Sequence, residues 1–84
     1  MVKRIIHLKT VERVKDFVKV VSKIECPTDL CSHDNHYIVD AKSIMGIFSL
    51  DISKPLTLII NDDEVNAGKY DSMLEKFLKD IEKI

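Results

Sequence analysis

The sequence predicts an α+β domain in which an antiparallel sheet carries helices on one face. Four short segments are rich in β-favouring aliphatic residues, and three others repeat apolar residues with the period of a helix. Along the chain these segments follow the order βαββαβα, which favours antiparallel pairing of the strands. With 84 residues, the chain is long enough for a single domain, spanning 1–84, with one modest core.

The first two elements are a strand over residues 2–8 and a helix that ends near Lys23. Ile5, Ile6 and Leu8 favour the strand. Thr10 precedes the helix, where its hydroxyl can accept a hydrogen bond from a free N–H group of the first turn. One face of the helix is apolar and is expected to be buried; it consists of Val11, Val14, Phe17, Val18 and Val21.

Two short strands follow the break that Pro27 makes in the chain. They are expected over residues 28–32 and 37–41, because both segments contain β-favouring residues. The polar segment between them, residues 33–36, is typical of a turn. These two strands therefore form a hairpin.

A short helix is expected directly after Ser43, whose hydroxyl is suited to cap it. The apolar residues that follow are Ile44, Met45, Ile47, Phe48 and Leu50. They wrap too far round one short helix to be buried together, so part of this ring is expected to face solvent. An exposed apolar cluster on a small protein usually marks a docking surface.

The last two elements are a strand over residues 56–60 and a helix capped by Asn66. The strand is nearly all apolar, which is typical of a strand inside a sheet. The acidic segment 62–64 before the helix is expected to be a solvated turn. The helix has the clearest helical period of the chain, formed by Tyr70, Met73, Leu74, Phe77, Leu78, Ile81 and Ile84.

Residues 42–50, KSIMGIFSL, closely resemble the regulatory-serine segment of HPr, the small phosphocarrier of the bacterial sugar phosphotransferase system. From Cys26 onward the chain can be laid on HPr-type sequences without a gap. The resemblance implies an HPr-like open-faced β-sandwich, with a four-stranded antiparallel sheet and three helices on one face. It also implies that Ile47 and Leu50 are buried, whereas Ile44, Met45 and Phe48 stay exposed around Ser43.

The resemblance is weaker in the first third of the chain, where the family carries its phosphate on a histidine. That histidine position falls on Thr10, and the position of the family's arginine falls on Glu12. A threonine hydroxyl forms a stable phosphate ester rather than a high-energy phosphoramidate, and a glutamate repels the incoming anion. The sequence therefore predicts an HPr-like protein without histidine phosphocarrier activity.

Function is then expected to lie in protein interaction and not in enzyme catalysis. In HPr the serine that matches Ser43 is phosphorylated by an ATP-dependent kinase, and the phosphorylated form docks on a transcriptional regulator of carbon catabolism. The resemblance implies phosphorylation of Ser43 as a switch, with Ile44, Met45 and Phe48 as the partner-binding residues. The expected partners are such a kinase and a transcriptional regulator or phosphotransferase-system enzyme.

Two alternatives remain open. In the first, the protein is a working phosphocarrier that uses another acceptor, such as His7 on the first strand. In the second, Cys31, His33 and His36, with Cys26 nearby, form a metal-binding domain, because cysteine and histidine are good zinc ligands. The spacing of these four residues lacks the usual C-x2-C and H-x3-H pairs, so no metal and no cofactor is the main expectation.

The composition argues against several broad classes of protein. The 13 basic and 14 acidic residues give a net charge of −1, which provides no general attraction to nucleic acid or to a membrane surface. No apolar run is long enough to span a membrane, and the amino terminus lacks the apolar core of a signal peptide. A cytoplasmic protein with two reduced cysteines is expected.

Overall fold

The computed structural model describes residues 1–78, and these follow the predicted order of elements. One short 3₁₀ turn, η1, is added before the last helix. The elements are β1 (Val2–Ile6), α1 (Val11–Val21), β2 (Thr28–Cys31), β3 (Ile38–Asp40), α2 (Ile44–Phe48), β4 (Leu56–Ile60), η1 (Glu64–Asn66) and α3 (Ala67–Leu78). Ile81 and Ile84, which were expected to continue the stripe of the last helix, lie outside the described residues.

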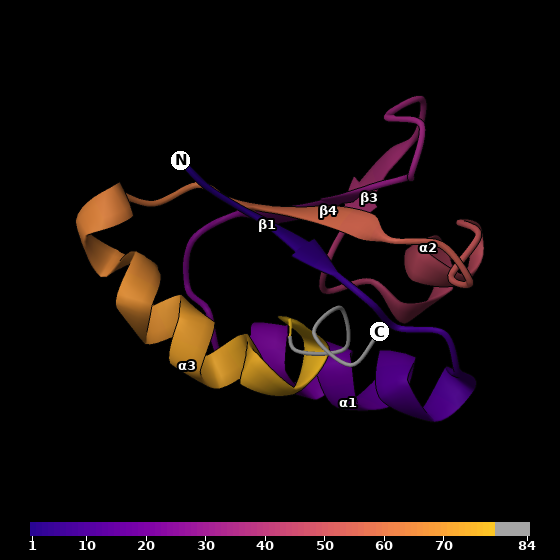
Figure 1. Ribbon diagram of the computed structural model, residues 1–84, viewed down its shortest axis with the longest axis horizontal. Coiled ribbons are helices and arrows are strands. Elements are labelled where there is room, and N and C mark those ends of the chain that lie inside the picture. Colours follow the sequence, from indigo (N-terminus) through magenta and orange to yellow (C-terminus); the bar gives the residue numbers. More distant parts are fainter. Residues whose placement is uncertain (79–84) are drawn as a thin grey trace.

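The four strands form one antiparallel sheet in the order β1-β4-β2-β3. The apolar strand β4 lies between β1 and β2, which confirms its expected place inside the sheet. Figure 1 shows α1 and α3 on the same side of the sheet, so one sheet face is covered and the other is left open. This arrangement is the predicted α+β open-faced sandwich.

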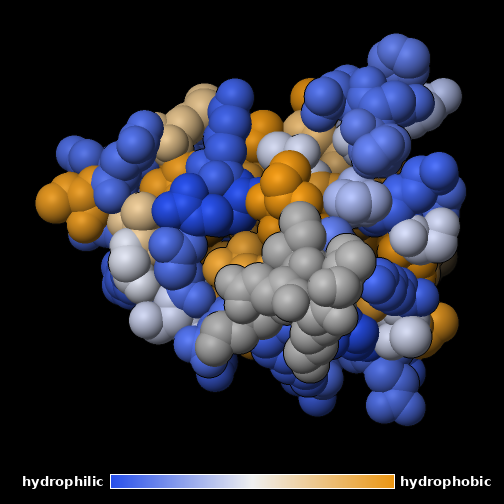
Figure 2. All heavy atoms as spheres, viewed as in Figure 1, coloured by the Kyte–Doolittle hydropathy of each residue, from blue (hydrophilic) through white to orange (hydrophobic). Residues whose placement is uncertain are grey.

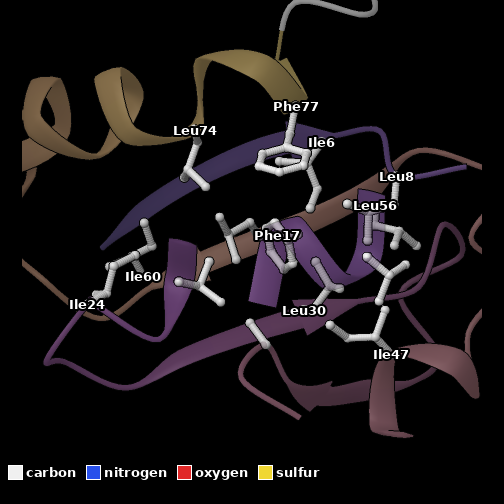
Figure 3. Close-up of a cluster of buried hydrophobic side chains, with 14 of the residues drawn as sticks. Ile6, Leu8, Phe17, Ile24, Leu30, Ile47, Leu56, Ile60, Leu74 and Phe77 are labelled. Carbon is white, nitrogen blue, oxygen red and sulfur yellow. The ribbon is translucent and has the colours of Figure 1, made fainter. Parts of the chain in front are cut away.

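The core lies between the sheet and the helices. Phe17 of α1 and Phe77 of α3 meet edge to face, with ring centroids 5.4 Å apart. Figure 3 shows Phe17 among aliphatic side chains from the sheet, including Ile6 and Leu30. An edge-to-face aromatic pair adds to the stability that simple burial provides, and here it joins the two long helices over the sheet.

The helical faces are mostly buried as expected, with one exception. Val14, Phe17 and Val21 of α1 are fully buried, whereas the side chain of Val11 is 52% exposed. Val11 is the first residue of α1. Its position satisfies the helical period, but the period alone does not tell how far the helix extends beyond the edge of the core. The expected burial of Val11 is therefore wrong.

Several element boundaries differ from the sequence prediction. β1 ends at Ile6, not at residue 8, because the chain leaves the sheet and turns at Lys9, whose φ is 70°. The Lys9 N–H group donates to the carbonyl of Ile52 at 2.9 Å, which ties this turn to the segment after α2. The hairpin strands β2 and β3 are also shorter than expected, and α1 ends two residues before Lys23.

The cap before the last helix is also different. Asn66 lies inside η1, and its side-chain amide donates to the Asp62 carboxylate at 3.2 and 3.3 Å. Asp63 caps η1 instead, because its carboxylate accepts from the Val65 N–H group at 3.1 Å. The expectation that Asn66 caps the last helix is wrong, since the 3₁₀ turn moves the capping position three residues upstream.

Polar side chains cover much of the molecular surface. Figure 2 shows mostly hydrophilic residues on this face, with smaller apolar areas between them. Within residues 1–78, no helix is both long enough and apolar enough to cross a membrane.

Candidate protein-interaction site

Ser43 caps α2 as predicted. Its backbone is extended, with φ −100° and ψ 108°, and its Oγ accepts a hydrogen bond from the Gly46 N–H group at 3.1 Å. At the other end of the helix, Ser49 Oγ donates to the carbonyl of Gly46 at 2.6 Å. Local hydrogen bonds therefore define both ends of a helix of only five residues.

Gly46 lets α2 approach β3 closely. A Cβ atom added at Gly46 would lie 3.2 Å from Ser43 Oγ and 3.2 Å from the Cβ of Val39 in β3. Both distances are shorter than ordinary van der Waals contact. The sequence pattern does not indicate this role of Gly46, because Val39 becomes its neighbour only in the folded chain.

α2 has a buried side and an exposed side. Ile47 is fully buried and Leu50 is 7% exposed, as expected. Met45 and Phe48 are 76% and 40% exposed, which also agrees with the expectation. Ile44 does not belong with them: it is half-buried and packs against the core. Residues three apart on a helix share a face, so Ile44 is drawn toward the core with Ile47.

The exposed part of α2 is therefore formed by Met45 and Phe48, next to the half-buried Ser43; we call these three residues the α2 surface. Lys42 holds the start of this helix in place. Its N–H group donates to the Asp40 carboxylate at 2.9 Å, and its ammonium group donates to the carbonyls of Ile24 and Cys26 at 2.5 and 3.4 Å. The α2 surface thus stands on a helix that is fixed from several sides.

The start of α1 is the second site that the sequence analysis singled out. Thr10 caps α1 through a hydrogen bond from the Arg13 N–H group at 3.2 Å, and both Thr10 and Glu12 are exposed. The Arg13 guanidinium donates to the His7 carbonyl at 2.8 and 3.3 Å and to the Lys76 carbonyl at 3.2 Å. It also lies 5.3 Å from the centre of the Phe77 ring. Arg13 therefore binds the end of α3 to the chain between β1 and α1.

His7 does not lie on the first strand, where the sequence placed it. It directly follows β1 and its side chain is only 7% exposed. The backbone N–H group of His7 donates to the Phe77 carbonyl at 3.2 Å. Within residues 1–78, the Nε2 atom of its imidazole has no hydrogen-bond partner. A donor protein must reach the imidazole to phosphorylate it, and this imidazole is enclosed.

The cysteine and histidine candidates are spread over separate places. Cys31 is buried at the end of β2, where burial raises the pKa of its thiol, and Cys26 is half-buried before that strand. His33 and His36 are exposed in the turn, and His36 Nδ1 lies 3.2 Å from the Asp34 carboxylate. Within the described part of the chain, no three His, Cys, Asp or Glu side chains are placed to hold a metal ion.

A polar cluster beside the end of α1 was not anticipated from the sequence. The Tyr70 hydroxyl donates to the Asp62 carboxylate, and Cys26 Sγ lies 3.4 Å from the same hydroxyl. The hydrogen bond to Tyr70 lowers the pKa of Asp62, and it raises the pKa of Tyr70. Asp62 is therefore part of a packed contact and not of a solvated turn. The sequence shows no signal for this contact, since Cys26 is 44 residues from Tyr70 and Asp62 lies outside α3, before η1.

The fold of this chain is similar to that of a solved HPr structure. The chain superimposes on the crystal structure of HPr-C-His from Thermoanaerobacter tengcongensis with a TM-score of 0.68 and 27% sequence identity. The match covers 90% of this chain and 92% of that one. The chain has an HPr-like fold. No protein-family model matches the sequence, and no curated protein matches it.

The HPr-like fold relates this chain to the phosphocarriers of the phosphotransferase system. HPr proteins act by contact with other proteins of that system and are phosphocarriers rather than catalysts.

Proposed function

We propose that this protein is an HPr-like regulatory module that works by docking other proteins through the α2 surface. The exposure of Met45 and Phe48 beside Ser43 is the observation that carries this proposal. The opposite side of the same helix, with Ile47, is locked into the core. Packing therefore accounts for one side of α2 but not for the other, and rigid exposed apolar side chains are typical of docking sites.

The second part of the proposal is that the protein does not carry phosphate on a histidine. The exposed capping residue at the start of α1 is Thr10, and the exposed neighbour Glu12 is negatively charged. Phosphotransfer needs a nucleophile that can pass the phosphoryl group onward, and an alkyl phosphate ester does not do so readily. The buried ring of His7 is a poor replacement.

The third part is that phosphorylation of Ser43 switches the docking surface. Ser43 Oγ already accepts the Gly46 N–H group, so a phosphate there would lie at the positive end of α2. It would add a charge of about −1.5 to −2 beside Met45 and Phe48 without removing the buried contacts of Ile47. The partners proposed are an ATP-dependent kinase and a transcriptional regulator or enzyme of the phosphotransferase system.

Phosphotransfer can be tested directly. The protein is incubated with phosphoenolpyruvate and the general enzyme of the phosphotransferase system, and its intact mass is measured. We expect no acid-labile gain of one phosphoryl group, while an HPr that carries the histidine gains one in the same reaction. A gain that disappears in His7→Ala would contradict the proposal and establish the alternative acceptor.

Docking can be tested with purified partners. Met45→Ala and Phe48→Ala are each expected to weaken binding to a candidate regulator or kinase by about tenfold or more. Val65→Ala is the matched control, because Val65 is 81% exposed and lies in η1, outside the α2 surface. Equal binding by all three variants would remove the α2 surface as the docking site.

A further inference from the structure

The open face of the sheet has a side-chain pattern of its own. Residues of a strand alternate between the two faces, and most of the strand residues that point to the helices belong to the core. The remaining ones line up across the sheet in two rows, because the strand registers place them side by side. One row is Ile5, Thr57, Cys31 and Ile38, and the other is Lys3, Ile59, Asp29 and Asp40.

The first row has an isoleucine at each end, with Thr57 and the buried Cys31 between them. The second row has Lys3 at one end, and Asp40 with its neighbour Asp29 at the other. Ile5 and Ile38 stand on the two edge strands and are 48% and 64% exposed. In the second row, Lys3 stands on the edge strand β1 and Asp40 on the opposite edge strand β3. The open face therefore carries a cation at one edge, an anion at the other, and isoleucines beside both.

We propose that two copies of this chain associate through their open faces, as a dimer with twofold symmetry. Consider a twofold axis that lies between the two sheets and runs parallel to the strands. It places β1 over the partner's β3 and keeps each row at the same height along the strands. Lys3 then faces the partner's Asp40, and Ile5 faces the partner's Ile38. Because the symmetry is twofold, each contact occurs twice.

The opposite charges at the two edges of the open face are the reason to expect a second copy of this chain as the partner. A face with one sign of charge repels its own copy, whereas this face presents opposite signs to itself after the rotation. Two sheets that pack face to face keep their strands within about 30° of one another, so the rows stay in register near the centre. The inner strands contribute the less favourable pair, in which Ile59 faces the partner's Asp29.

The dimer is expected to be weak. A face four strands wide and five residues long covers only about 300 Å² at the usual strand spacing and rise. Stable interfaces bury about 800 Å² on each partner. We therefore expect a dissociation constant on the order of 10⁻⁴ M. The α2 surface lies outside the paired faces, so the dimer leaves it free and the inference does not depend on the proposed function.

Charge reversal tests the arrangement. Sedimentation equilibrium over about 0.01 to 1 mM protein measures the dissociation constant of each species. Lys3→Asp and Asp40→Lys each give a copy whose two edges carry the same sign, so each is expected to dimerise at least about tenfold more weakly than the original chain. An equal mixture of the two variants restores opposite charges at both contacts, and its heterodimer is expected to regain the original affinity.

Two further variants control the experiment. Lys15→Asp makes the same change of net charge as Lys3→Asp on an exposed residue of α1, and it should leave dimerisation unchanged. Ile38→Ser removes an exposed apolar contact without a change of charge and should weaken the dimer. The proposal is overturned if the original chain stays monomeric up to about 1 mM, a concentration ten times the expected dissociation constant. It is also overturned if the mixture fails to restore association, or if Lys15→Asp weakens it as much as Lys3→Asp does.

Discussion

Thr10 and Ser43 occupy equivalent local positions at the starts of α1 and α2. Both have an extended backbone, and each side-chain oxygen accepts from the N–H group three residues later, at 3.2 Å for Thr10 and 3.1 Å for Ser43. The surroundings differ. Exposed Glu12 follows Thr10, whereas exposed Met45 and Phe48 follow Ser43.

The difference in surroundings shows that capping a helix and acting as a switch are separate properties of these hydroxyl groups. A cap is a local device, and it stabilises either helix in the same way. What a modified hydroxyl does next depends on the neighbours: a negative charge beside Glu12 meets repulsion, while one at Ser43 changes an apolar surface. The two sites therefore call for different experiments.

The largest effect is expected on the buried side of α2. Ile47→Ala should lower the free energy of unfolding by about 2–4 kcal/mol, because it leaves a cavity under a fully buried side chain. Chemical denaturation of the variant and of the original protein measures the difference. A loss no larger than that of Met45→Ala would mean that α2 is not anchored through Ile47.

An intermediate effect is expected for the two caps. Thr10→Ala and Ser43→Ala should each lower the free energy of unfolding by about 1 kcal/mol, since each removes the acceptor for one N–H group of a first turn. Only Ser43→Ala should also abolish phosphorylation by a serine kinase of the phosphotransferase system. Kinase-dependent phosphate that stays on the Ser43→Ala variant would place the modified residue elsewhere.

A smaller effect on stability is expected at the exposed side of α2. Met45→Ala should change the free energy of unfolding by less than about 0.5 kcal/mol, because the side chain is 76% exposed. Its effect should appear in partner binding instead, which isothermal titration calorimetry measures on the same samples. A melting temperature that falls as far as that of Ile47→Ala would show that Met45 serves packing.

The smallest effect on the fold is expected for Ser43→Asp. Aspartate also caps helices well, and its negative charge is favourable at a helix amino terminus. Its melting temperature should therefore match that of the original protein, and binding to the regulator or kinase should change. If binding is also unchanged, Ser43 is a helix cap without a switching role.

Local patterns in the sequence were sufficient to predict the α2 helix and the order of the elements. The cap at Ser43 and the central apolar strand β4 follow from side chains within a few residues of one another, whereas the burial of Ile47 was expected from the resemblance to HPr. The resemblance to HPr pointed to the same fold, and the solved HPr structure agrees with it. The absence of carrier chemistry and the role of Ser43 stay predictions.

Other features were decided by contacts between distant parts of the chain. His7 is buried because the end of α3 packs over it, and its N–H group binds the Phe77 carbonyl at 3.2 Å. Ile44 is drawn into the core with Ile47, although its place in the sequence pattern resembles that of Phe48. A periodicity shows which residues share a face, but not where the edge of the core falls across that face.

The sequence by itself determined where helices and strands form, since propensity, capping and apolar period act over one or two turns. The tertiary structure alone decided which distant side chains meet and which stand at opposite edges of the sheet. The Tyr70 contact with Asp62 and the opposite placement of Lys3 and Asp40 on the open face arise from helix packing and strand register. The physical reason is that both arrangements involve residues of different segments, whose spacing along the chain carries no periodic signal, so only the folded backbone places them.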